Sequence, residues 1–149
     1  MGLGHVPQEP IHPPSSGSQL QRRKYRGIAK RRSVTVNLAN VARGKWAEDL
    51  VARHYSANGF EVLDRNWRFK GGELDIIARK GDVLVVCEVK ARASDEYGIP
   101  AEAITPTKQR RLRIGGIKWL KEHDLHGTRL RFDVACVLGT RLEIIENAF

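Results

Sequence analysis

The sequence has few cysteines, no closely spaced cysteine pair and no long apolar run. Cys87 and Cys136 lie far apart inside apolar, strand-like segments, which excludes a disulfide framework and a zinc ribbon and predicts buried free thiols in a reducing cytosol. No stretch is long enough to cross a bilayer, and no apolar segment follows the N-terminal charges as in a signal peptide. We therefore expect a soluble, cytoplasmic protein with no membrane partner.

Several catalytic patterns are also missing. The chain has no glycine-rich phosphate loop of the P-loop or dinucleotide type. The hydroxyls of Ser94 and Thr105 have no histidine in a triad-like pattern, which argues against a nucleophilic hydrolase. His123 and His126 precede Cys136, but histidines at the end of a helix are more often solvated than bound to zinc.

Acidic residues are scarce in the first 45 positions, which hold nine lysines and arginines but one acid, Glu9. The rest of the chain has 17 basic and 16 acidic residues, so most of the formal net charge of +9 lies in this leader. Residues 1–21 are rich in proline, serine and glycine, and the basic cluster Arg22–Arg32 follows. We expect residues 1–43 to be a disordered basic tail, either simply solvated or attracted to nucleic-acid phosphates.

The remaining residues, 44–149, predict one α/β domain. Apolar spacing indicates a first helix from Leu38 or Gly44 to Asn58, with Trp46 and Leu50 facing inward. The later elements are expected as strands at 60–69, 73–79 and 83–90, a helix at 106–122, and strands at 129–138 and 141–145. This αβββαβ order, with a further strand at the end, predicts a mixed sheet flanked by helices.

The second predicted helix has a clear start and an unusual middle. Thr105 is a suitable N-cap and Pro106 a suitable first residue. The pair Gly115-Gly116 lies on its apolar face, where glycine destabilises a helix unless the backbone must approach another element closely.

Charged residues interrupt two of the apolar strands. Glu73 and Asp75 share one strand face, and Glu88 and Lys90 share one face of the next strand, because side chains alternate between faces. A buried cluster of like charges is strongly unfavourable without a cation. We therefore predict a site for a hard divalent cation such as Mg²⁺ with Asp75 and Glu88 as direct ligands, since Mg²⁺ takes one or two protein carboxylates and keeps several waters.

This residue set suits phosphodiester hydrolysis. A bound divalent ion activates water and neutralises charge on the phosphoryl oxygens. Lys90 is placed to orient that water or to stabilise the transition state, and Glu48 on the first helix is a third candidate acid. Four basic residues are expected to contact nucleic-acid phosphates: Arg92, Lys108, Arg110 and Arg111. Taken singly, a Glu-x-Lys pair on a strand is more often just solvated.

Several motifs together resemble the YraN-like family of uncharacterised proteins. They are Gly44–Ala52, Asn66–Arg68, Gly72–Asp75, Glu88–Arg92, Tyr97–Pro100 with Glu102-Ala103, Lys108–Leu112 and Arg131–Val134. That family is similar to the restriction-endonuclease-like PD-(D/E)XK nucleases, and particularly to archaeal Holliday-junction resolvases. The resemblance implies a restriction-endonuclease-like core and a catalytic set of Glu48, Asp75, Glu88 and Lys90, with Mg²⁺ or Mn²⁺ as cofactor.

We accordingly expect a metal-dependent endonuclease acting on nucleic acid, DNA in preference to RNA, with branched recombination intermediates as candidate substrates. One alternative is a non-catalytic nucleic-acid-binding module on the same fold. Another is a protein-interaction adaptor that uses the tail and an apolar helix face. Analogy with the resolvases is also compatible with a homodimer.

Overall fold

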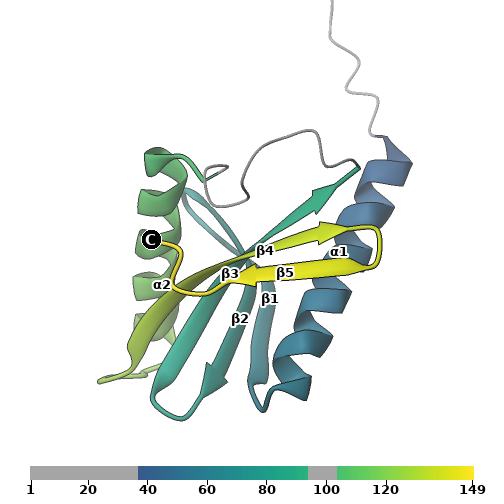
Figure 1. Cartoon of the computed structure of the whole chain (residues 1–149). Coiled ribbons are helices and arrows are strands. Elements are labelled where there is room, and N and C mark those ends of the chain that lie inside the picture. The colour runs from purple at the N-terminus through teal and green to yellow at the C-terminus, as the bar shows by residue number, and fades with distance from the viewer. Residues whose placement is uncertain (1–36, 94–103) are drawn as a thin grey trace, which may run out of the picture. The chain divides into compact units, whose positions relative to one another are not determined.

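A computed structural model describes residues 37–93 and 104–149, and this region forms two helices and five strands (Figure 1). They are α1 (Leu38–Ala57), β1 (Glu61–Phe69), β2 (Gly72–Lys80), β3 (Val83–Arg92), α2 (Pro106–Glu122), β4 (Arg129–Leu138) and β5 (Arg141–Ile145). The predicted order of elements is confirmed. The tail up to residue 36, Ser94 and the Tyr97–Pro100 motif lie outside the described residues.

The strands form one sheet in the order β1-β2-β3-β4-β5. Neighbouring strands are antiparallel except β3 and β4, which run parallel. Helix α2 lies between these two strands in the chain, as expected because parallel strands need a crossover connection. The predicted mixed α/β sheet flanked by helices is therefore confirmed.

Side-chain caps define where both helices begin. Asn37 accepts a hydrogen bond from the Ala39 N–H at the start of α1, so the helix takes the earlier of its two predicted starts. Residues 38–43, which were assigned to the tail, are therefore helical. Thr105 Oγ1 accepts a hydrogen bond from the Lys108 N–H at 3.2 Å, and Pro106 is the first residue of α2, as predicted.

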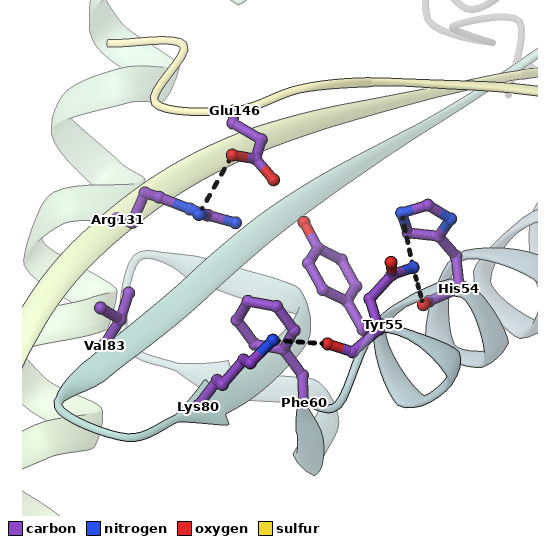
Figure 2. A pocket seen from close by; sticks show the side chains of 8 residues that line it. His54, Tyr55, Phe60, Lys80, Val83, Arg131 and Glu146 are labelled. Atoms are coloured by element: carbon purple, nitrogen blue, oxygen red, sulfur yellow. Dashed lines mark hydrogen bonds and ion pairs between the residues drawn. The ribbon is translucent and has the colours of Figure 1, made fainter.

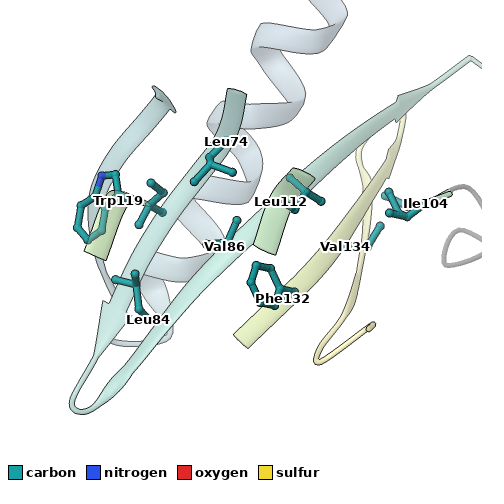
Figure 3. Close-up of a cluster of buried hydrophobic side chains, with 10 residues drawn as sticks. Leu74, Leu84, Val86, Ile104, Leu112, Trp119, Phe132 and Val134 are labelled. Carbon is teal, nitrogen blue, oxygen red and sulfur yellow. The ribbon is translucent and has the colours of Figure 1, made fainter. Parts of the chain in front are cut away.

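The two helices cover opposite faces of the sheet (Figure 1). On the α2 face, Leu112 and Trp119 pack into the cluster shown in Figure 3. Its fully or largely buried members are Leu74, Ile77, Leu84, Val86, Ile104, Leu112, Trp119, Phe132, Val134 and Cys136. On the α1 face the corresponding members are Ala47, Val51, Tyr55, Ile76, Ala78, Val85, Cys87, Ala135 and Val137. Both cysteines are buried and free, as predicted.

The buried side of α1 differs from the prediction by one position along the helix. Ala47, Val51 and Tyr55 are its buried residues, whereas Trp46 is 39% exposed. The prediction that Trp46 faces inward was therefore wrong. Ala47 is small and therefore a weaker hydrophobic signal than the neighbouring indole. Residues 47, 51 and 55 nevertheless repeat every four positions, as a helical face requires.

Gly115 lets α2 approach the sheet closely. A Cβ atom at this position would lie 2.7 Å from Phe69 Cε1 and 2.8 Å from Leu74 Cδ2, too close for any other residue without movement. At Gly116 the nearest atoms, on Leu130 and Val86, would lie 3.4 Å away. The predicted close backbone approach therefore occurs, and it occurs at Gly115, against the residue that precedes Asp75.

Neither α1 nor α2 has the combined length and apolar character that a membrane-spanning helix needs.

Candidate metal and nucleic-acid site

The paired ladder between β2 and β3 stops at Ile76 and Cys87, one residue short of the two predicted metal ligands. Beyond this point β2 leaves β3 but stays paired with β1. Asp75 Oδ2 accepts a hydrogen bond from the Val89 N–H at 2.8 Å, so a side-chain oxygen replaces the main-chain acceptor of the ladder. The separation of the two strands thus places the Asp75 carboxylate against β3, beside Glu88.

Glu88 is 3% exposed, and an ammonium group contacts each of its carboxylate oxygens. Lys90 Nζ donates a hydrogen bond to Oε1 at 2.9 Å. Lys108 Nζ, from the first turn of α2, lies 3.0 Å from Oε2. That second contact lacks hydrogen-bond alignment, so among the described residues Oε2 is a buried acceptor without a hydrogen bond. Each lysine side chain is one-third exposed.

Asp75 is less well compensated than Glu88, which contacts two lysine ammonium groups. Burial, followed by the neighbouring Glu88 carboxylate, raises the pKa of Asp75 to about 6. The Val89 N–H and the Lys108 ammonium lower this pKa, and Glu48 makes a smaller upward contribution. A buried carboxylate of this kind needs a further cation to remain ionised at neutral pH without loss of stability.

Glu48 is held beside this pair by an irregularity in β1. Asn66 has a φ angle of 52°, in the left-handed region, and its Nδ2 donates to Glu48 Oε2 at 2.8 Å. Arg65 lies 3.7 Å from the same oxygen and 2.7 Å from Asp49 Oδ1. The sequence analysis included Asn66 in a motif but gave it no role. An asparagine inside a strand was the available signal, since asparagine tolerates this conformation.

The predicted phosphate-binding residues fall into separate places. Lys108 contacts Glu88, so in this structure it belongs to the carboxylate cluster. Arg110 and Arg111 are exposed on α2, close in sequence to Lys108. Arg92 is half-buried at the end of β3. Together with Arg43 and Trp46 it lines a hollow of about 500 Å³ near the end of β4.

The donor set fits an open Mg²⁺ or Mn²⁺ site. No three histidine, cysteine, aspartate or glutamate side chains within residues 37–93 and 104–149 form a metal-binding group. Mg²⁺ does not need such a cage, because it retains several waters and commonly takes one or two carboxylates. The buried Oε2 of Glu88, which lacks a hydrogen bond, and the neighbouring Asp75 supply oxygen ligands of the required type.

A third buried carboxylate, to which the sequence analysis gave no role although it lies in the Arg131–Val134 motif, is fully paired. Asp133 is 0% exposed and accepts hydrogen bonds from Tyr55 Oη at 2.7 Å, Arg131 Nη2 at 2.8 Å and the Asn147 N–H at 3.0 Å. Burial raises the pKa of the Tyr55 phenol, which keeps it protonated and able to donate. This network backs onto a hollow of about 410 Å³ where Arg131 also pairs with Glu146 (Figure 2).

Comparison with known proteins places the candidate residues inside a shared domain. A sequence profile described as "Uncharacterised protein family UPF0102" matches residues 47–137, which include Glu48, Asp75, Glu88 and Lys90. A UPF0102 protein of Rhodococcus opacus is 50% identical over 115 residues, covering 74% of this chain and 98% of the relative. A UPF0102 protein of Frankia casuarinae is 44% identical over 116 residues, with the same coverage. The chain therefore belongs to the uncharacterised protein family UPF0102.

Proposed function

We propose that this protein is a divalent-metal-dependent endonuclease that acts on nucleic acid, built on a restriction-endonuclease-like core. The observation that carries this proposal is the buried Asp75–Glu88 pair, formed where two strands separate, in which Glu88 Oε2 lacks a hydrogen bond and the pKa of Asp75 is raised to about 6. Two adjacent buried carboxylates cost free energy in a metal-free protein, and a bound cation would offset that cost.

In this proposal Asp75 and Glu88 hold Mg²⁺ or Mn²⁺, and the ion supplies Lewis-acid activation of water and charge neutralisation at the phosphate. Lys90 is fixed by its 2.9 Å hydrogen bond to Glu88. Its ammonium therefore stays beside the carboxylates, where it can stabilise negative charge in the transition state. Glu48, oriented by Asn66, would add a third carboxylate beside the ion.

Nucleic acid is the proposed substrate because Lys90 and Lys108 lie at the carboxylates and further basic and aromatic side chains are found on α1, α2 and the end of β3. Arg92, Arg110 and Arg111 provide phosphate contacts, and the exposed indole of Trp46 provides a stacking surface for a base. The order of helix glutamate, strand aspartate and strand Glu-x-Lys resembles that of archaeal Holliday-junction resolvases. Branched DNA is therefore the first substrate to test.

The second candidate is a nucleic-acid-binding module of the same fold that does not cleave. The nearly even balance of basic and acidic residues after position 45 argues mildly for it, or for a dependence of phosphate binding on the basic tail. The intact Asp75, Glu88 and Lys90 cluster favours the enzyme.

Cleavage assays separate the two candidates. The full chain is incubated with Mg²⁺ or Mn²⁺ and labelled single-stranded, duplex, flap and four-way-junction DNA and structured RNA. We expect cleavage of at least one substrate to fall about 100-fold or more in both Asp75→Asn and Lys90→Ala, the size of effect found for electrostatic groups in active sites.

Glu73→Gln is the matched control, because Glu73 lies two residues from Asp75 but is half-exposed and pairs with Arg68 at 3.2 Å. It should cleave like the wild type. Nucleic-acid binding without cleavage by the wild type would support the binding module, and full activity of Asp75→Asn would rule out the proposed catalytic site.

A further inference from the structure

Lys108 is positioned differently from the other basic residues of α2. Its backbone N–H donates to the N-cap Thr105, which fixes the residue in the first turn of the helix. Its ammonium then reaches across to β3 and lies 3.0 Å from Glu88 Oε2. Arg110 and Arg111, two and three residues further on, are exposed. Lys108 thus puts a positive charge beside a carboxylate oxygen that is otherwise available to a metal ion.

The two lysines on Glu88 are not equivalent. Lys90 is on the same strand as Glu88 and makes an aligned hydrogen bond to Oε1. Lys108 comes from another element, and its contact with Oε2 has charge and proximity but no hydrogen-bond alignment. Both side chains are one-third exposed, and a lysine has a flexible four-carbon stem that can carry the ammonium back to solvent, so the difference in alignment is what separates them. Of the two, Lys108 is the lysine that an arriving cation can displace.

We propose that Lys108 is an internal counter-cation that occupies the place of the divalent ion at Glu88 Oε2, and that metal binding releases its ammonium to a phosphate of the substrate. The inference rests on the metal site of the proposed function but not on cleavage. Metal binding and substrate binding are then coupled, because Lys108 neutralises Glu88 in the metal-free protein and contacts nucleic acid only once the ion is bound. Substrate affinity then depends on the metal through Lys108.

The first consequence is competition. In the wild type, an ion that binds Oε2 must break the Lys108 contact, and the lost charge-pair energy weakens metal binding. Removing the ammonium removes this competitor, so Lys108→Met should bind Mn²⁺ about tenfold more tightly at pH 8, the factor that corresponds to one partly buried ion pair. The general loss of positive charge from α2 should contribute much less, because exposed charges are screened.

Arg110→Met is the matched control, since it deletes one positive charge from the same helix at an exposed position. Mn²⁺ affinity is measured by calorimetry on the full chain, after thermal unfolding confirms that each variant is folded. A tenfold gain in Lys108→Met with less than about a twofold change in Arg110→Met supports the proposal. Equal affinities of Lys108→Met and the wild type, or weaker binding by the variant, overturn it. Absence of Mn²⁺ binding in every protein overturns the metal site as well.

The second consequence is a metal-dependent effect on nucleic-acid binding. Affinity for a labelled four-way junction and a single strand is measured in EDTA and in Ca²⁺, with recovery of uncut substrate checked at the end. Lys108→Met should bind several-fold more weakly than the wild type in Ca²⁺, with a shallower salt dependence, and equally in EDTA. The same loss in both conditions would show that Lys108 contacts phosphate without displacement, and no loss in Ca²⁺ would show that it never does; either result overturns the proposal.

Discussion

Two buried acids in the same sheet, Asp133 and Asp75, have opposite surroundings. Asp133 on β4 is fully buried and receives three hydrogen bonds, one of them from the Arg131 guanidinium. Asp75 on β2 is also buried, but within residues 37–93 and 104–149 its carboxylate accepts a hydrogen bond from one backbone N–H, and a second buried carboxylate, Glu88, is its neighbour. Burial is therefore common to both, and only the supply of donors and positive charge differs.

That difference separates a structural acid from a candidate functional acid. A carboxylate that is fully hydrogen-bonded and paired with a cation joins distant parts of the chain, as Asp133 joins α1, β4 and the segment after β5. A carboxylate that lacks these partners destabilises the metal-free fold. Such a residue is typical of a functional site, where a bound cation can neutralise it. The same substitution at the two positions should therefore have opposite effects on stability.

The largest effect is expected for Asp133→Asn. The amide cannot pair with Arg131, and it places an N–H₂ group among donors, so the free energy of unfolding should fall by about 3–5 kcal/mol. Denaturant unfolding at pH 8 measures this, with Glu146→Gln as the control, because Glu146 also pairs with Arg131 but is 65% exposed. A loss below about 1 kcal/mol in Asp133→Asn would show that this network is not a stabilising one.

The opposite sign is expected for Asp75→Asn in the metal-free protein. Asparagine Oδ1 can still accept from the Val89 N–H, while the buried negative charge beside Glu88 disappears. The pKa of Asp75 is about 6 in the fold against an ordinary 3.8, so its ionisation above pH 6 destabilises the wild type. The variant should therefore be about 2–3 kcal/mol more stable at pH 8 in EDTA, and it should lose Mn²⁺ affinity.

The stability difference between the wild type and Asp75→Asn should depend on pH, whereas a difference in packing alone would not. Because the folded state holds its Asp75 proton to a higher pH than the unfolded state, this residue's favourable contribution is complete below about pH 4 and is lost as pH rises through about 6. Thermal unfolding of the wild type and Asp75→Asn should agree near pH 4 and diverge up to pH 7. A variant that is less stable than the wild type at pH 8 would show that the ionised carboxylate is already well compensated.

The sequence predicted what depends on neighbours along the chain. Thr105-Pro106 identified the start of α2, and the alternation around Asp75 and Glu88 identified two adjacent strands and the residues that meet there. The Asp133 network was missed because Tyr55 and Asp133 lie 78 positions apart and no local pattern joins them. Lys108 was assigned to phosphate from its place at a helix start, and its contact with Glu88 depends on how α2 packs on the sheet.

A smaller effect on stability and metal affinity is expected for Gly115→Ala. It should concern the surroundings of Asp75 and leave the Asp133 network unchanged. The added methyl group would lie 2.8 Å from Leu74 Cδ2, so it pushes α2 away from the residue next to Asp75. Overpacking of about 1–3 kcal/mol should outweigh the gain of about 1 kcal/mol in helix propensity, and Mn²⁺ affinity should fall several-fold. Gly116→Ala is the control, since its nearest contacts are at 3.4 Å, and it should be neutral or slightly stabilising. Unchanged Mn²⁺ affinity in a destabilised Gly115→Ala would show that the metal ligands do not depend on how closely α2 approaches the sheet.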